Sequence, residues 1–187
     1  MGSYITTYTH RHFDPTDPDP ELILIEDIAH ALSMLCRGNG HVSSFWSVGE
    51  HCICCAKEAA GRGLSQKVIL ACLLHDASEC YMSDVPRPLK QNMKDYKQQE
   101  SSLLDVIYRK FLGEALTEEE KKQIKAIDDD LLWYDLEMLL GEKQDREKPE
   151  LHIRLDYKVR PFDMVEREYL DFFRELSSDL ELSLIHI

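Results

Sequence analysis

An apolar stretch near the middle of the chain contains two adjacent ionisable side chains. Residues 70–76 read LACLLHD, so His75 and Asp76 stand inside a helical pattern that is otherwise suited to a core. Burying such a pair costs several kcal/mol unless the two groups are paired or coordinate a metal. Any fold of this chain must therefore bring polar partners to this buried helix.

Apolar residues recur at helical spacing in six segments, and strand signals are few. Ser65 fits the N-cap of one segment, and Thr117 with Glu120 has the pattern of a capping box. Two prolines predict a rigid loop over residues 84–88, and residues 141–161 are polar and loop-like. The predicted helices span residues 23–35, 48–60, 66–81, 90–112, 117–140 and 162–176. We therefore predict an all-α, single-domain helical bundle.

The domain organisation is simple. The 187 residues suffice for one domain with a sizeable core and are too few for two ordinary ones. Residues 1–21 are expected to form a non-helical arm with a short strand near residues 4–8, because the three prolines within residues 14–20 cannot lie inside a helix. The helical domain then covers residues 22–181. Residues 182–187 match the translation of a transposon-end adapter used in sequencing libraries, so we take them as a non-native tail.

The charge balance limits the classes of partner. Lys and Arg total 22 and Asp and Glu total 35, which gives a formal net charge of −13. This field argues against binding to nucleic acid or to an anionic membrane surface. It does not exclude a small anionic substrate, because a few local cations or a metal can reverse the field inside a pocket. Without a long apolar run or a signal-peptide pattern, we expect a cytoplasmic protein with no membrane-spanning helix.

The six cysteines could be misread as a disulfide set. Most lie in predicted helices, and two of them are adjacent, so we interpret them as reduced and mostly buried small apolar residues. The alternative is a zinc site formed by Cys52, Cys54 and Cys55. Their spacing does not match a CxxC knuckle and no second pair follows, which argues against that alternative.

Further ligand-type residues accompany the central His-Asp pair. Glu79 follows His75 by four residues, which places it one helical turn further on the same side. His51 lies on the preceding predicted helix, and the triplet at residues 128–130 interrupts the apolar face of a later one. Two imidazoles and two carboxylates from three helices suit one divalent ion of manganese, iron, cobalt, nickel or zinc, and the imidazoles disfavour magnesium.

The order His51, His75-Asp76 and Asp128 resembles the HD-domain metal-dependent phosphohydrolases. Three local strings are similar to the bacterial and phage 5′-deoxynucleotidase-like branch of that family: SVGEH at residues 47–51, LLHDASE at 73–79 and SDVPRPLK at 83–90. The resemblance covers roughly residues 22–140. It implies that His51, His75, Asp76 and Asp128 are the metal ligands, which requires Asp128 to lie within about 8 Å of the His75 imidazole.

The resemblance also implies roles around the metal. Glu79 would be a general acid or base, and Asp84 would orient a water or protonate the leaving 5′-oxygen. In this branch an arginine upstream of the first histidine holds the phosphate, and Arg37 is the candidate here. The branch has a tryptophan after that arginine, whereas this chain has Gly38, which leaves the choice between ribose and deoxyribose open.

Two further residues are candidate substrate contacts with a structural alternative. Lys90 is either a phosphate contact or a solvated lysine, and Trp46 either stacks on a base or belongs to the core. The expected partner is a small nucleotide, and the resemblance also admits a homodimer. We expect a phosphomonoesterase acting on nucleoside 5′-monophosphates. The alternatives are a hydrolase of a guanosine alarmone, which the Cys80 after Glu79 disfavours, and a non-catalytic nucleotide sensor.

Overall fold

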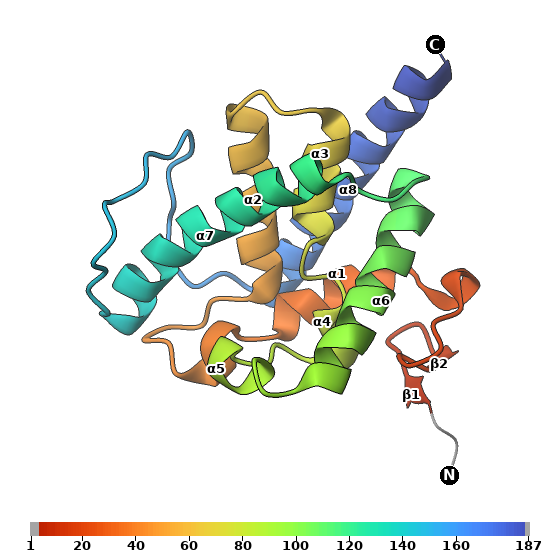
Figure 1. Cartoon of the computed structure of the whole chain (residues 1–187), viewed down its shortest axis with the longest axis horizontal. Helices are drawn as coiled ribbons and strands as arrows, with labels where there is room; N and C mark the ends of the chain where they lie inside the picture. Colours follow the sequence, from red (N-terminus) through yellow and green to blue (C-terminus); the bar gives the residue numbers. More distant parts are fainter. Residues whose placement is uncertain (1–3, 186–187) are drawn as a thin grey trace.

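A bundle of helices packs around one buried helix, α3 (Gln66–Leu74), in this computed structural model (Figure 1). The structure describes residues 4–185, with the backbone alone at 179 and 181–185. Every α3 residue from Val68 to Leu74 is buried. This helix packs against α2 (Val48–Gly61), α6 (Lys94–Leu112), α7 (Glu118–Leu140) and α8 (Phe162–Ile185). The predicted all-α fold is confirmed.

Local side-chain bonds start the helices that position the site. Ser47 and Glu50 form a capping box at the beginning of α2, and Thr117 and Glu120 form the predicted one at the beginning of α7. Ser65 accepts a hydrogen bond from the Val68 amide at the start of α3. These bonds satisfy amides that have no partner within the first turn of a helix. The sequence positions of the caps therefore determine where each helix begins.

The predicted helix over residues 66–81 is wrong as a single element. Helix α3 ends at Leu74, a turn follows, and a short helix α4 (Glu79–Met82) begins after it. Two side chains occupy carbonyl oxygens in the last turn of α3, because the His75 ring donates to one and the Tyr169 hydroxyl donates to another. Those carbonyls no longer need amides from a continuing helix. The His-Asp pair consequently lies at a helix end rather than inside a helix.

The predicted helix over residues 90–112 is likewise divided. A short helix α5 (Arg87–Lys90) begins within the segment predicted as a loop, and α6 begins only at Lys94. Proline is tolerated in the first helical turn, so Pro88 does not prevent α5 from forming. Met93 has φ −106° and ψ 75°, outside the helical region, and it separates the two helices.

The N-terminal arm is ordered against the bundle. Strands β1 (Ile5–Thr6) and β2 (His12–Phe13) form an antiparallel hairpin, followed by the 3₁₀ turn η1 (Pro20–Leu22). Phe13 is fully buried, and its ring centroid lies 4.2 Å from that of Tyr81. The hairpin is thereby fastened to the helix that carries Glu79.

Two further segments complete the fold. Helix α1 (Ile25–Met34) packs against α8 and α2, and the 3₁₀ segment η2 (Arg37–Gly40) follows it. Helix α8 continues to Ile185, beyond the predicted end at residue 176, and residues 186–187 of the predicted tail lie outside the described residues. Within residues 4–185, no helix combines the length and the apolar character needed to cross a bilayer.

Candidate metal centre

Side chains from three helices meet at one point in the bundle. His51 lies on α2, His75 and Asp76 follow the last residue of α3, and Asp128 lies midway along α7. Asp128 Oδ1 is 3.3 Å from His51 Nε2 and 3.8 Å from His75 Nε2. His75 Nε2 is also 3.3 Å from Asp76 Oδ2. The structure thus brings together the four predicted metal ligands, which we call the His/Asp centre.

The hydrogen bonds of the two rings determine which nitrogens face this centre. His75 Nδ1 donates to the Cys72 carbonyl at 2.8 Å, and His51 Nδ1 donates to Asp135 Oδ2 at 3.2 Å. Each ring therefore turns its other nitrogen, Nε2, toward carboxylate oxygens, and such a nitrogen and oxygen need a proton or a cation between them. His75 Nε2 is buried without a hydrogen bond. The residues present therefore fit a divalent metal.

The charges of the centre shift the pKa of its members. Burial opposes ionisation of Asp76, but the charge of His75 lowers its pKa to about 2. The pKa of Asp128 is also lowered against burial, by the hydrogen bond to His51 and the charge of His75. Burial lowers the pKa of His75, but the charge of Asp76 raises it well above its ordinary value. The carboxylates therefore favour a positive charge at this position, which a bound cation would also supply.

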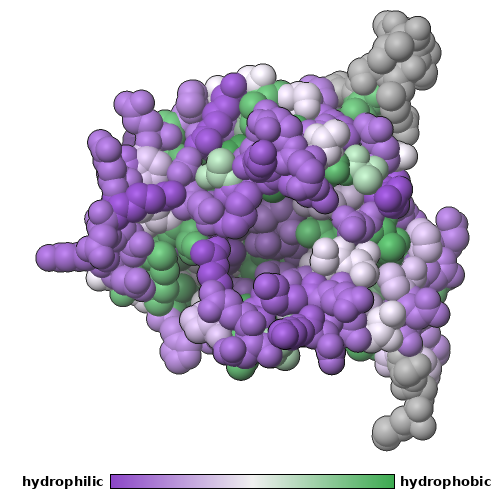
Figure 2. Space-filling view, viewed as in Figure 1, coloured by the Kyte–Doolittle hydropathy of each residue, from purple (hydrophilic) through white to green (hydrophobic). Residues whose placement is uncertain are grey.

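A cavity of about 260 Å³ opens beside the His/Asp centre. Figure 2 shows a hollow near the middle of this face, between the positions of α7 and α5 in Figure 1. The residues that line this cavity are of three chemical kinds. The cations are Arg37, Arg87 and Lys90; the acids are Asp76, Glu79, Asp84, Asp128 and Asp135; the aliphatic residues include Val42, Leu132, Leu136, Leu139 and Leu140.

A second cavity, of about 340 Å³, reaches the same centre from between α6 and α7. It shares Asp76 and Asp128 with the first cavity and includes His75. The remaining lining residues are half apolar or aromatic and half polar or charged: Leu104, Tyr108, Leu116 and Ile124, and Ser101, Asp105, Lys121 and Lys125. The centre is therefore accessible from two sides.

The two predicted catalytic carboxylates both line the first cavity. Glu79 is only 6% exposed, and its Oε2 atom is buried without a hydrogen-bond partner. Burial raises the pKa of Glu79 well above its ordinary value, and the charges of Asp76 and Asp84 raise it further. Glu79 is thus a carboxyl group that retains its proton at a pH where an exposed glutamate would not. Asp84 precedes α5 and faces the same space.

The predicted substrate contacts separate into two groups. Arg37 lines the cavity with NH1 at 3.5 Å from Asp76 Oδ2 and NH2 at 3.2 Å from Asp135 Oδ2. Lys90 also lines the cavity, and its Nζ is 2.6 Å from Glu100 Oε1. Trp46, in contrast, is buried and packs on Tyr157, with ring centroids 4.8 Å apart. The structure does not bring Trp46 to the cavity.

Asp135 is a site residue that the sequence reasoning missed. One of its oxygens accepts from both His51 and Arg37, and Tyr157 donates to the other oxygen at 2.9 Å. Asp135 thus connects a metal ligand to the candidate phosphate-binding arginine. Its position seven residues after Asp128 places both carboxylates on one face of α7, a signal present in the sequence. Tyr157 lies in a segment without helix or strand and had no such signal.

The cysteines also gather near the centre. None of the six forms a disulfide, as predicted, and Cys52, Cys55 and Cys72 are buried. Groups suited to a metal among the described residues combine Cys55 with His51 and His75, or Cys52 with His75 and Asp76. The three-cysteine zinc site weighed above is not among them. The cysteines near the centre accompany histidines rather than one another.

An all-helical protein with a His/Asp centre from three helices belongs to a recognisable class, and comparison with known proteins identifies it. A family model for the HD domain matches residues 41–156, a region that contains the four candidate ligands. The chain is 38% identical over 109 residues to the uncharacterised protein YfdR of Escherichia coli, which is 58% of each chain. It is 36% identical over 124 residues to an uncharacterised protein of Rhodobacter capsulatus, which is 63% of each chain.

The chain therefore belongs to the HD domain family. The groups of side chains suited to a metal also lie within the matched region. The matches span about 58% and 63% of the lengths of the two relatives.

Proposed function

We propose that this protein is a metal-dependent phosphomonoesterase that hydrolyses nucleoside 5′-monophosphates. The observation that carries the proposal is the lining of the cavity beside the His/Asp centre, which contains both cations and aliphatic side chains. A nucleoside monophosphate has matching parts, an anionic phosphate and a largely apolar base. The cavity volume of about 260 Å³ is suited to a small ligand rather than a polymer.

The metal would be held by His51, His75, Asp76 and Asp128. A divalent ion bound there supplies Lewis acidity toward water and toward a phosphoryl oxygen. Arg37 remains charged next to Asp76 and Asp135, and its planar guanidinium can bind two phosphoryl oxygens at once. Lys90 adds a second positive charge at the same wall.

The two cavities support an in-line displacement. The oxygen of water must approach phosphorus opposite the leaving 5′-oxygen, and the centre is open on two sides. A P–O bond forms to water as the bond to the 5′-oxygen breaks, and the products are inorganic phosphate and the nucleoside. The leaving oxygen needs a proton, which the Glu79 carboxyl can donate because burial raises its pKa, and Asp84 lines the same cavity to orient water.

The experiment is a panel of ribo- and 2′-deoxynucleoside 5′-monophosphates assayed for phosphate release with manganese, cobalt, nickel, iron(II), zinc or magnesium. We expect release with at least one of the first five metals and loss of release in Asp76→Ala and Glu79→Gln. Nucleotide binding without turnover under every metal would contradict the proposal and favour a sensor. A nucleoside 3′-monophosphate serves as the control substrate.

A further inference from the structure

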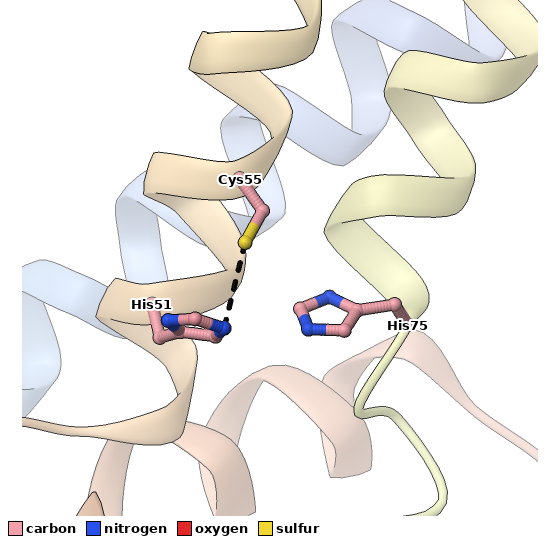
Figure 3. Close-up of side chains that lie close together, drawn as sticks. All are labelled: His51, Cys55 and His75. Atoms are coloured by element: carbon pink, nitrogen blue, oxygen red, sulfur yellow. Dashed lines mark hydrogen bonds between the residues drawn. The ribbon is translucent and has the colours of Figure 1, made fainter. Parts of the chain in front are cut away.

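Cys55 lies one helical turn after His51 on α2 and faces the His/Asp centre. It is buried, with 1% of its surface exposed, and its Sγ atom is 3.5 Å from His51 Nε2. Figure 3 shows the sulfur and the two imidazole rings turned toward one another, two groups from α2 and one from the end of α3. None of the four ligand roles assigned above uses this thiol.

The spacing of the three donor atoms fits a single ion. His51 Nε2, Cys55 Sγ and His75 Nε2 all lie within 4.8 Å of one another. Metal–nitrogen bonds of about 2.0–2.1 Å and metal–sulfur bonds of about 2.3 Å at a tetrahedral angle place nitrogen and sulfur roughly 3.5 Å apart. The distance from Cys55 to His51 meets this requirement without movement.

A second observation indicates that this space is built for a ligand. The side chain of His75 is 8% exposed, and its Nε2 atom is buried without any hydrogen bond. Its other nitrogen is held by the Cys72 carbonyl, so the ring cannot turn away without losing that bond. A buried ring nitrogen without a hydrogen bond, 3.3 Å from Asp76 Oδ2 and beside a buried sulfur atom, is consistent with a position that a cation occupies.

We propose that Cys55 is an additional, sulfur ligand of the metal centre, bound together with His51 and His75, and that it favours zinc or cobalt(II) over manganese and magnesium. Thiolate sulfur and imidazole suit zinc and similar ions, whereas manganese and magnesium prefer oxygen. On binding, the S–H bond is replaced by a sulfur–metal bond and the proton passes to solvent. The proposal rests on the metal centre of the proposed function and does not depend on its substrate.

Cys52 is the competing sulfur donor. It forms a group with His75 and Asp76, and it is also buried. That group contains one imidazole, whereas the group with Cys55 contains both. Cys52 and Cys55 are three residues apart on α2 and lie on the same side of the helix, about 60° from each other around its axis, but their sulfur atoms belong to different groups of candidate ligands. The two cysteines can therefore be tested separately.

The test uses the full-length protein loaded with cobalt(II). We expect the wild type to show a thiolate-to-cobalt charge-transfer band in the near ultraviolet, and Cys55→Ser to lose it. Cys52→Ser and Cys54→Ser should retain the band; Cys54 lies on the same helix and belongs to neither candidate group. Zinc affinity of Cys55→Ser, measured by competition with a chelator, should fall about tenfold or more while manganese affinity changes less than about twofold.

Three results would overturn the proposal: a wild type without the band, a Cys55→Ser variant that keeps it, or loss of the band in Cys52→Ser alone. Circular dichroism establishes that each variant is folded. If Cys55→Ser fails to fold, zinc-edge X-ray absorption of the wild type decides, because one sulfur neighbour supports the proposal and none contradicts it. A band that depends on Cys55 without phosphate release would disprove the substrate and leave this inference intact.

Discussion

Helix α2 carries two buried ionic clusters that differ in whether their polar atoms all have hydrogen-bond partners. At Glu58, two turns after His51, every carboxylate oxygen is bonded: one to Arg62 and to the His152 ring, the other to the backbone amides of His152 and Ile153. At the His/Asp centre, polar atoms of His75 and Glu79 are buried without hydrogen-bond partners. A buried charge that serves the fold is saturated by protein groups, whereas one that serves a ligand keeps positions open.

The largest effect on activity should come from removing a candidate metal ligand of the His/Asp centre. We expect Asp128→Asn to lower kcat/KM for phosphate release by about 10³-fold or more, because a neutral amide binds a divalent ion poorly. The matched control is Asp129→Asn, which removes the same charge from the neighbouring, partly exposed position on α7. Steady-state kinetics and metal analysis of both variants check this. Equal losses in the two would contradict the assignment of Asp128.

The cluster around Glu58 should respond in the opposite way, with a loss of stability and little change in metal binding. Glu58→Ala should lower the free energy of unfolding by about 3 kcal/mol, because it leaves buried amides and Arg62 without their acceptor. Metal affinity should change less than about twofold. Urea unfolding and metal titration measure the two quantities. Glu58→Gln is the matched variant and should cost less, since it keeps one acceptor oxygen. A large loss of metal affinity with normal stability would break the comparison.

Asp135 should behave as a positioning residue, because it acts through His51 and Arg37. Asp135→Asn should lower metal affinity about 10- to 100-fold, which is the usual result of removing a partner of a metal-binding histidine. KM should rise as well, since Arg37 loses an ion pair. Tyr157→Phe removes only the hydroxyl that donates to Asp135 and should cost less than about tenfold. Unchanged metal affinity in Asp135→Asn would show that this carboxylate is structural alone.

The smallest effect concerns the pH dependence of the metal-free protein. Burial raises the pKa of Glu79 above its ordinary value of 4.5, so the folded protein keeps a proton that the unfolded chain releases as pH rises. The free energy of unfolding therefore falls as pH rises above about 4.5, and Glu79→Gln lacks this loss. The stability advantage of the variant should grow from pH 4 to pH 8 in urea unfolding with a chelator. An advantage independent of pH would contradict the raised pKa.

Much of the fold could be predicted because its signals are local. Helical apolar spacing and the caps at Ser65 and Thr117 locate α3 and α7. The predicted end of α3 was wrong because a side chain from a distant part of the sequence bonds to its last turn. The Tyr169 hydroxyl, from α8, occupies a carbonyl at the end of α3, and nothing near residue 74 in the sequence indicates that this partner will arrive.

The candidate site likewise contains residues that the sequence predicted and residues whose roles depend on tertiary packing. The His51, His75, Asp76 and Asp128 set was predictable because its residue types and order are specific. Trp46 shows the limit, since an aromatic residue near a site has the same pattern whether it faces a ligand or, as here, packs against Tyr157. The shared contacts of Asp135 and the approach of Cys55 to His51 depend on how α2 and α7 pack.

The order of residues along the chain was sufficient to predict a helical bundle, two of its helix caps and the meeting of four metal-type side chains, because each depends on neighbours within a few turns or on a distinctive motif. Folding alone established which buried polar atoms are satisfied and which remain open. That distinction depends on distances of a few ångströms between helices far apart in the chain, and those distances are set by the packing of the whole core.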